Sequence, residues 1–387
     1  MSETPVGRRP GWRMTWSIKA SKLCNLRCRY CYEWADLADP RRIPLSGWRR
    51  ILVAIRRYHR LLTKRRGRPG RSLLALHGGE PSLLPVAYLR QVVSLARAVL
   101  DAETSTGGEY RWAIQTNLYS LPRRLEELLV GERFHVSVSF DGVPGARVHR
   151  RGGVTEERVA ANLSRLLDRG LRPTGAVVLA GHTRHHLRGL YGFFAARGMP
   201  FKVIPMLAVP QLSARDPLAL DEREAVAALT DLFEHWIDDG CRVEVEPLRR
   251  CLTTALLSMA GRSRPVRRRR AAERALVVDT DGSLYPRAAA RGVDDRLGNL
   301  FEQSLDEILA GARHAASLAA DDERVRVHCA PCRFAEACDS RPVLAAPRTP
   351  LEGPCAIESR LCRAIVELVE AEGLDASELR GLARSAA

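Results

Sequence analysis

Three cysteines gathered near the N-terminus are the residues with the clearest chemistry. Cys24, Cys28 and Cys31 stand at C-x3-C-x2-C spacing in the segment KLCNLRCRYCYEW, residues 22–34. Thiolates bind iron well, and clustered cysteines at fixed spacing are how a chain ligates an iron–sulfur cluster. A cubane cluster with four protein ligands needs one more thiolate than this loop supplies, so one iron would stay free to bind another molecule. Three unrelated loop cysteines, or an incomplete zinc knuckle, are the plainer alternatives.

A second group of cysteines lies near the C-terminus of the 387-residue chain. Its members, a C-x2-C-x5-C run and two cysteines downstream, are Cys329, Cys332, Cys338, Cys355 and Cys362. Taken alone, this spacing is also typical of a zinc ribbon or knuckle. The remaining two cysteines, Cys241 and Cys251, lack ligand spacing, and we expect them to be buried structural thiols.

Alternating strands and helices must position these thiols. Apolar periodicity predicts strands at 15–20, 72–76, 111–115, 135–140, 174–179 and 201–205. The intervening helices are expected at 45–63, 86–100, 123–130, 155–169 and 187–197. Strands that alternate with helices argue for parallel βα units, and six of them suggest an α/β fold with a partial, TIM-like (β/α)6 barrel. In such a barrel the active site lies at the C-terminal ends of the strands.

Polar residues directly follow several of these strands. They are Gly78, Gly79 and Glu80 after the second strand, Asn117 after the third, Ser139 at the end of the fourth, and Arg150 and Arg151 further on. Paired glycines permit a close backbone approach, and the carboxylate can accept a hydrogen bond from an ammonium group. A simple turn at the glycines, and a surface position for the arginines, are the alternatives. We interpret Asp141-Gly142 as a turn.

The first cysteine group, with Tyr30 between its last two cysteines, resembles the motif of the radical S-adenosylmethionine (SAM) superfamily. The resemblance implies a [4Fe-4S] cluster held by three cysteines, whose open iron is chelated by the amino and carboxylate groups of SAM. Reduction would cleave SAM to methionine and a 5′-deoxyadenosyl radical, which abstracts a hydrogen from the substrate. The cofactor carries that chemistry, and the protein supplies position and excludes water.

Further residues match the SAM-binding positions of that superfamily. The triplet at 78–80 resembles its GGE motif, which contacts the SAM amino group. Asn117 matches a polar position near the SAM ribose or carboxylate, and Ser139 matches the SAM contact at the S-x-D-G strand end of the peptide-modifying branch. Arg151, or its neighbour Arg150, would reach the SAM carboxylate. The sequence identifies no catalytic acid or base.

The C-terminal part resembles the SPASM extension of radical SAM maturases that act on ribosomally made peptides. A predicted hairpin over 276–286 carries DG-x-x-YP, and Leu-Gly-Asn follows at 297–299. The extension usually holds two auxiliary [4Fe-4S] clusters, each with four cysteines. Here Arg287 and Pro342 stand at cysteine positions of the first cluster, so the resemblance implies one auxiliary cluster. Its ligands would be Cys329, Cys332, Cys338 and Cys362, with Cys355 as the alternative fourth ligand and a zinc ion as the structural alternative.

These patterns divide the chain into five parts. They are an N-terminal arm (1–14), a radical SAM core barrel (15–240), a helical and Arg-rich linker (241–275), a SPASM-like auxiliary-cluster domain (276–372) and a C-terminal helix or tail (373–387). Helices are also expected at 221–239 and 247–260, and we expect Cys362 to open a C-terminal helix.

One departure from the family pattern narrows the expected chemistry. Formylglycine-forming members have an Asp base after the hairpin cysteine, where this chain has Ala288, and sulfatase maturation is therefore disfavoured. We expect a maturase that forms an intramolecular side-chain cross-link, carbon–carbon or carbon–heteroatom, in a precursor peptide. Its partners would be the leader and core of that peptide and an external one-electron reductant such as flavodoxin or ferredoxin. The alternatives are a radical SAM enzyme for a small molecule or RNA, and a non-catalytic iron–sulfur or zinc scaffold or redox sensor.

The composition favours a cytoplasmic protein with no membrane partner. No apolar run approaches the length of a membrane span, and the N-terminus lacks an apolar signal core. The formal net charge is +16, but the basic residues are mostly arginines spread along the chain. A solvated basic surface, or a docking surface for an acidic leader peptide, explains that charge better than a nucleic-acid partner does.

Overall fold

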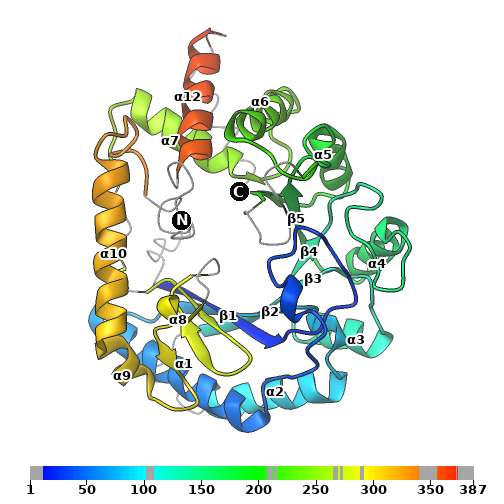
Figure 1. The fold of residues 1–387 in the computed structure, drawn as a ribbon, viewed down its shortest axis with the longest axis vertical. Coiled ribbons are helices and arrows are strands. Elements are labelled where there is room, and N and C mark those ends of the chain that lie inside the picture. Colours follow the sequence, from blue (N-terminus) through cyan, green and yellow to red (C-terminus); the bar gives the residue numbers. More distant parts are fainter. Residues whose placement is uncertain are drawn as a thin grey trace, which may run out of the picture.

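The six expected strands lie side by side in one curved sheet of the computed structural model (Figure 1). The structure describes residues 12–101, 109–206, 212, 216–264, 269–270, 273–287, 292–339, 355–371 and 373. The strands are β1 (Arg13–Ser21), β2 (Arg71–Gly78), β3 (Glu109–Thr116), β4 (His135–Ser139), β5 (Thr174–Leu179) and β6 (Phe201–Pro205). Each pairs in parallel with the next, which confirms the predicted partial barrel.

The five helices that connect these strands, and α6 after the last of them, lie outside the curved sheet (Figure 1). They are α1 (Leu45–Arg66), α2 (Val86–Leu100), α3 (Arg123–Gly131), α4 (Glu156–Asp168), α5 (Leu187–Ala195) and α6 (Glu222–Asp238). Short 3-10 helices, η1 (Trp34–Asp36) and η2 (Pro81–Leu83), follow the ends of the first two strands. All five helices expected between the strands are present, with ends that differ from the prediction by a few residues at most.

Alternation along each strand determines how the sheet is packed. In β1 the side chains of Met14, Trp16 and Ile18 are fully buried, and the residues between them are less buried. Trp16 packs edge-on against Tyr58 of α1, with the ring centroids 5.9 Å apart. A strand whose alternate residues are large and apolar must cover that face with helices, and the apolar stripe of α1 provides the cover.

The C-terminal part of the chain extends the sheet at both edges and adds helices. The strands are β7 (Val245–Glu246), β8 (Ala275–Val278), β9 (Ser283–Tyr285) and β10 (Gly298–Asn299), and the helices are α7 (Leu248–Met259), α8 (Gly292–Asp295), α9 (Leu305–Ala310), α10 (Ala312–Cys329) and α12 (Ala356–Ala371). In the described residues the sheet has ten strands, in the order β10-β9-β8-β1-β2-β3-β4-β5-β6-β7. The expected hairpin is present as β8 and β9, and β8 pairs in parallel with β1.

Helix α12 packs against α6 and α7, at the end of the sheet opposite to α1 and α2 (Figure 1). The expectation that Cys362 opens this helix is wrong, because α12 begins at Ala356 and Cys362 lies well inside it. Cys355 is the residue that stands directly before the helix. The predicted arm and tail, Ala288 and Pro342 lie largely or wholly outside the described residues. No helix in the described part of the chain is long and apolar enough to cross a membrane.

A buried histidine couples the stability of the barrel to pH. His59 of α1 is 3% exposed, and its Nε2 lies 2.6 Å from the Ser72 hydroxyl oxygen of β2. Burial lowers the pKa of His59 to about 4, because the charged imidazolium would lose its hydration. Between that value and the ordinary pKa near 6.5, the unfolded chain binds a proton that the folded chain does not. Protonation therefore favours the unfolded state as the pH falls through this window.

We predict that the free energy of unfolding falls between pH 6.5 and pH 4, and that His59 contributes at most about 1.4 kcal/mol per pH unit to the slope. A His59→Gln variant retains a hydrogen-bonding group but does not titrate, so its slope should be shallower. Urea unfolding at a series of pH values measures this. The exposed His186 provides the matched control, since His186→Gln should leave the slope unchanged. Equal slopes for His59→Gln and the unaltered chain would contradict the assignment.

Candidate metal and SAM site

The cysteine loop, residues 22–34, leaves β1 at the C-terminal end of the strand. Cys24 and Cys28 are buried, and Cys31 is partly buried. The Cys24 N–H donates to the Leu37 carbonyl at 3.0 Å, and the Cys31 N–H donates to the Cys28 carbonyl at 2.8 Å. The loop is thus fixed by backbone hydrogen bonds, within itself and to the segment that follows it, and it places all three cysteines at the edge of the sheet where the parallel strands end.

The two glycines of the 78–80 triplet let β2 end directly against this loop. The Gly79 N–H donates to the Ser21 carbonyl at 3.0 Å, and the Glu80 N–H donates to the Leu23 carbonyl at 2.8 Å. A Cβ atom on Gly79 would lie 2.1 Å from the Lys22 carbonyl oxygen, so a larger residue cannot fit there. Gly78 has φ +113, a backbone conformation that favours glycine. Both glycines are therefore required by the close approach of the two segments.

The Glu80 carboxylate ties the ends of β2 and β3 together. It is 2% exposed and accepts from the Ser82 N–H at 2.9 Å, the Thr116 hydroxyl at 2.6 Å and the Asn117 N–H at 2.6 Å. The Asn117 side-chain amide then donates to the Asn25 side-chain oxygen at 2.9 Å, inside the cysteine loop. Burial raises the pKa of Glu80, and these donors oppose the rise. The structure thus brings Glu80 and Asn117 to the loop, as predicted from strand order, and gives both a positioning role.

A buried ion pair fastens the other side of the loop. Tyr30 donates its hydroxyl to the Asp141 carboxylate, which lies at the end of β4. Arg147 Nε lies 3.1 Å from Asp141 Oδ2, and the Val178 N–H of β5 donates to Oδ1 at 2.9 Å. Burial alone would raise the pKa of Asp141, but Arg147 and the hydrogen bonds outweigh it and lower that pKa to about 2. The carboxylate is therefore a permanent anion between the loop and two strand ends. His182, whose Nε2 is 3.8 Å from Asp141 Oδ2, stacks on Tyr30 and completes this group.

A second buried charge group joins the end of the loop to the hairpin. Lys19 Nζ of β1 lies 2.7 Å from Glu33 Oε1 and 3.5 Å from Asp279 Oδ2. The side chain of Lys19 is 9% exposed, so its charge is neutralised almost without solvent. Because Asp279 directly follows β8, this contact connects the C-terminal hairpin to the mouth of the barrel.

The two other residues predicted to contact SAM have fewer contacts with the loop. Ser139 ends β4, and its hydroxyl accepts from the Gln115 side-chain amide at 3.4 Å. Arg151 is exposed, and its N–H donates to His149 Nδ1 at 3.3 Å. The arginine whose side chain is buried against Tyr30 is Arg147, which the sequence reasoning did not select. The roles toward SAM stay predictions for these two residues, and equally for Gly78, Gly79, Glu80 and Asn117.

The chemistry of the three loop thiols fits an iron–sulfur cluster. Burial raises the pKa of Cys24 to about 12 and that of Cys31 to about 11, and the Glu80 charge adds to the effect at Cys24. Metal binding must therefore displace protons that the protein alone holds tightly. Within the described residues, no three Cys, His, Asp or Glu side chains converge on one point as the ligands of a single ion do. Cluster ligands have no such need, since each cysteine binds a different iron.

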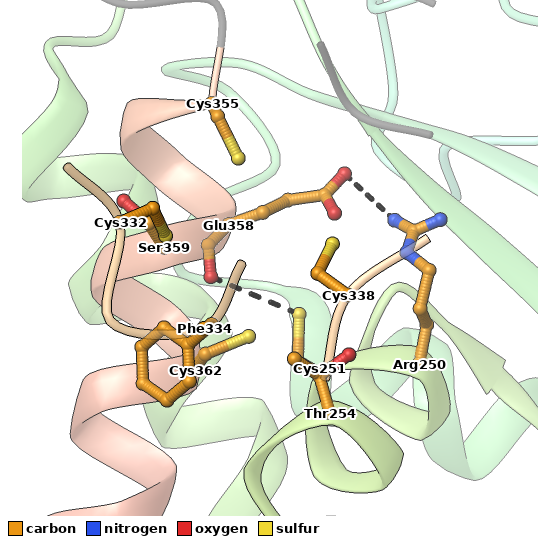
Figure 2. Close-up of a pocket in the computed structure, with 10 residues that line it drawn as sticks. All are labelled: Arg250, Cys251, Thr254, Cys332, Phe334, Cys338, Cys355, Glu358, Ser359 and Cys362. Carbon is orange, nitrogen blue, oxygen red and sulfur yellow. Dashed lines mark hydrogen bonds and ion pairs between the residues drawn. The ribbon is translucent and has the colours of Figure 1, made fainter. Parts of the chain in front are cut away.

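The second cysteine group surrounds a cavity between α7, α12 and the segment after α10 (Figure 2). The cavity has a volume of about 320 Å³, part of which is open to solvent. Its lining includes Cys251, Cys332, Cys338, Cys355 and Cys362. Arg250 also lines it, and the buried Nε of that guanidinium has no hydrogen-bond partner among the residues that the structure describes. An orphaned donor beside several thiols fits a sulfur-rich anionic group in this space.

The thiols of this group fall into two sets. Cys355 interacts electrostatically with Cys338, Cys332 and Cys329, and its pKa is raised chiefly by burial. Cys251 instead hydrogen bonds with Cys362, and this contact, followed by burial, raises the pKa of the Cys251 thiol. Figure 2 shows the Cys362 sulfur directed toward Cys251, whose own sulfur is directed toward the Glu358 carbonyl oxygen, and Cys355 lies at the opposite end of the cavity. The predicted burial of Cys251 is confirmed, but its position beside the second cysteine group was not predicted.

The comparisons with known proteins agree with this geometry. Residues 18–194 match the family model of the Radical SAM superfamily. The cysteine-type anaerobic sulfatase-maturating enzyme of Clostridium perfringens (strain ATCC 13124) is 24% identical over 305 residues, which are 75% of this chain and 78% of that protein. The corresponding enzyme of Clostridium novyi (strain NT) is 22% identical over 75% of this chain and 77% of its own.

Solved structures resemble the fold over almost the whole chain. Native anSMEcpe with bound AdoMet and the Cp18Cys peptide has a TM-score of 0.73 at 19% identity, and covers 96% of this chain and 99% of its own. Streptococcus suis SuiB bound to the precursor peptide SuiA has a TM-score of 0.55 at 15% identity, and covers 85% and 72%. The partial parallel barrel and the three-cysteine loop at its strand ends agree with the family match, and the chain is an enzyme with a radical SAM domain over residues 18–194. That family implies a [4Fe-4S] cluster and SAM.

We predict that Asp141→Asn destabilises the protein by about 3 kcal/mol, because it leaves the buried Arg147 guanidinium without a counter-charge and loosens Tyr30. Urea unfolding measures the change, and iron content should fall with it because the cysteine loop loses an anchor. The control is Asp231→Asn, which removes the partner of Arg188 in a pair whose side chains are about half exposed. That variant should change stability little. Equal effects from the two substitutions would contradict the role given to Asp141.

Proposed function

We propose that this protein is a radical SAM maturase of a ribosomally synthesised precursor peptide, and that it forms an intramolecular carbon–carbon or carbon–heteroatom side-chain cross-link. The observation that carries the proposal is that one fold holds two separate groups of cysteines. The cysteine loop lies at the barrel mouth beside Gly79 and Glu80, and a separate thiol-lined cavity lies under α12. A scaffold or sensor has no need of a three-thiol site with an iron left open.

The residues of this chain would bind and orient the cofactors. Cys24, Cys28 and Cys31 would hold the first cluster, and Asn117 and Ser139 would contact SAM. When bound, the cluster and SAM supply reductive cleavage of SAM and abstraction of a hydrogen atom from the substrate. Asp141 and Glu80 keep the loop in place, so that the thiols meet the cofactors in one arrangement, and the surrounding buried side chains exclude water. The electron would come from a reductant such as flavodoxin or ferredoxin.

A peptide is the substrate class best supported by the relatives. Both solved structures described above are of proteins with a bound peptide, Cp18Cys in one and the precursor SuiA in the other. The sulfatase-maturating relatives favour a second candidate, oxidation of a Cys or Ser side chain to an aldehyde. Against it, Ala288 stands where the resemblance expects an Asp base, and a methyl group cannot take a proton. Cross-linking therefore ranks ahead of aldehyde formation.

The proposed auxiliary cluster would be held by Cys329, Cys332, Cys338 and Cys355. This set is supported by the electrostatic grouping of Cys355 with the other three thiols. Cys355 and Cys362 are seven residues apart, a separation that corresponds to about 10 Å along a helix. The other three ligands leave one position of the cubane to fill, so only one of these two cysteines is needed. Cys355 thereby replaces Cys362 as the preferred fourth ligand. The cluster would accept the electron left on the substrate after the cross-link forms.

Co-expression of this protein with a short peptide encoded beside its gene tests the proposed function. We expect the peptide to lose paired hydrogens, because each cross-link replaces two bonds to hydrogen with one bond between side chains. Tandem mass spectrometry locates the bond, and a hydrazide probe reports any aldehyde. The control is the Cys24→Ala, Cys28→Ala, Cys31→Ala variant, which should leave the peptide unchanged. An aldehyde in place of a cross-link would support oxidation instead, and release of no 5′-deoxyadenosine from SAM and reductant would refute both candidates.

Iron analysis tests the auxiliary ligands separately from activity. We predict that Cys355→Ala lowers the iron content of the anaerobically reconstituted protein by about four atoms per chain, the content of one cubane. Cys362→Ala should retain that iron. The reverse pattern would make Cys362 the fourth ligand and return the assignment to the first expectation from the sequence.

A further inference from the structure

Two cysteines beside the auxiliary cavity are left over once the proposed ligands are assigned. Cys251 comes from α7 and Cys362 from α12, and they are 1% and 6% exposed. The structure gives the Cys251 sulfur two neighbours, the Cys362 thiol and the Glu358 carbonyl oxygen at 4.0 Å. Core cysteines normally pack against hydrocarbon, whereas these two have their sulfurs within hydrogen-bonding reach of one another.

An ion pair beside these cysteines already joins the two helices. Arg250, next to Cys251, has its Nη2 2.7 Å from Glu358 Oε1, and Glu358 lies one turn before Cys362 on α12. Both side chains of the ion pair are largely buried. A disulfide requires two sulfurs that approach without backbone movement, and a fixed helix pair with neighbouring thiols supplies that condition.

We propose that Cys251 and Cys362 form a redox-active dithiol that closes into a disulfide and links α7 to α12 across the wall of the auxiliary cavity. The proposal rests on the ligand set given above, in which Cys355 completes the cluster and Cys362 stays free. The link would join parts of the chain 111 residues apart, the separation of Cys251 from Cys362 (362 − 251). It would hold α12 in place when the cluster is absent, for example after exposure to air.

The oxidation is a balanced exchange with a low-molecular-weight disulfide. One of the two thiols first gives up its proton to solvent, a step that the raised pKa of Cys251 makes slow at neutral pH. The thiolate so formed attacks the small disulfide and releases one small thiol, which leaves a mixed disulfide on the protein. The second thiolate attacks the protein sulfur of that mixed disulfide and releases the second small thiol. The protein dithiol loses two electrons and two protons, and the small disulfide gains them. The cavity, which is partly open to solvent, provides the access that two buried thiols otherwise lack.

Diamide, a small diazene that takes up the same two hydrogens, is the probe for the experiment. The cluster-loaded protein is treated with diamide, the remaining thiols are alkylated under denaturing conditions without reductant, and the digest is analysed by mass spectrometry. We expect one cross-linked peptide pair that contains Cys251 and Cys362 and is two hydrogens lighter than the reduced pair. The same sample should retain its iron, since the proposed ligands are not used.

Two variants make the experiment specific. Cys362→Ser should abolish the cross-linked pair and leave Cys251 fully alkylated. Cys241→Ser is the matched control, because Cys241 is also buried and has no thiol neighbour among its described interactions, and it should leave the pair unchanged. The proposal is overturned if both cysteines of the unaltered protein are recovered as alkylated thiols, if Cys362 is joined to Cys355, or if Cys362→Ser loses the iron of a cubane. Peptide modification is not measured, so these outcomes are distinct from a failure of the proposed function.

Discussion

The carboxylate of Asp141 is the interaction on which the metal site depends. It is an anion with almost no solvent, and it persists because Arg147, Tyr30 and the Val178 N–H all contact it. A buried charge that loses one such partner has no water to replace it, so the whole group must stay together. Since Tyr30 stands between two of the loop cysteines, the requirement that Asp141 be satisfied also fixes where Cys28 and Cys31 lie. An electrostatic constraint thus becomes a geometric one for the thiols.

Residues at the ends of the parallel strands make the other contacts that hold the cysteine loop in place. Three of the strands that end at this edge, β2, β3 and β4, are each followed by a residue that hydrogen bonds to the loop or to a neighbouring strand end. Glu80 follows β2, Asn117 follows β3 and Asp141 follows β4, and their partners lie in the loop or at neighbouring strand ends. On the opposite side, Lys19 and Glu33 extend the same arrangement to Asp279 behind β8. The added hairpin is therefore part of the barrel mouth through charge pairing as well as through sheet pairing.

The sequence predicts the local elements and the residues at strand ends, because both depend on short-range patterns. Periodicity places β5 and β6 correctly, and the C-x3-C-x2-C spacing identifies the loop. What it cannot predict depends on contacts between distant segments. The Asp141-Gly142 pair looks like a turn until Tyr30 and Arg147 are brought to it. Cys251 lacks ligand spacing because its neighbours come from another helix, far along the chain. The start of α12, in contrast, could have been predicted from the sequence, because Gly353-Pro354 is a local signal for a helix that follows.

The two thiol groups are built on the same electrostatic plan. Beside each lies an arginine that is mostly buried and paired with a carboxylate, Arg147 with Asp141 at the loop and Arg250 with Glu358 at the cavity. A cluster ligated by thiolates is anionic, and an unpaired arginine would attract it most strongly but would be costly to bury before the cluster is loaded. A pair keeps the site stable before loading, because the charge of the arginine is already compensated. At the cavity, the Nε of Arg250 is a hydrogen-bond donor with no partner among the described residues. Hydrogen bonds to cluster sulfurs raise the reduction potential. At the cavity, Arg250 would therefore contribute both to the stability of the apoprotein, through its pair with Glu358, and to the reduction potential of the proposed cluster, through this N–H.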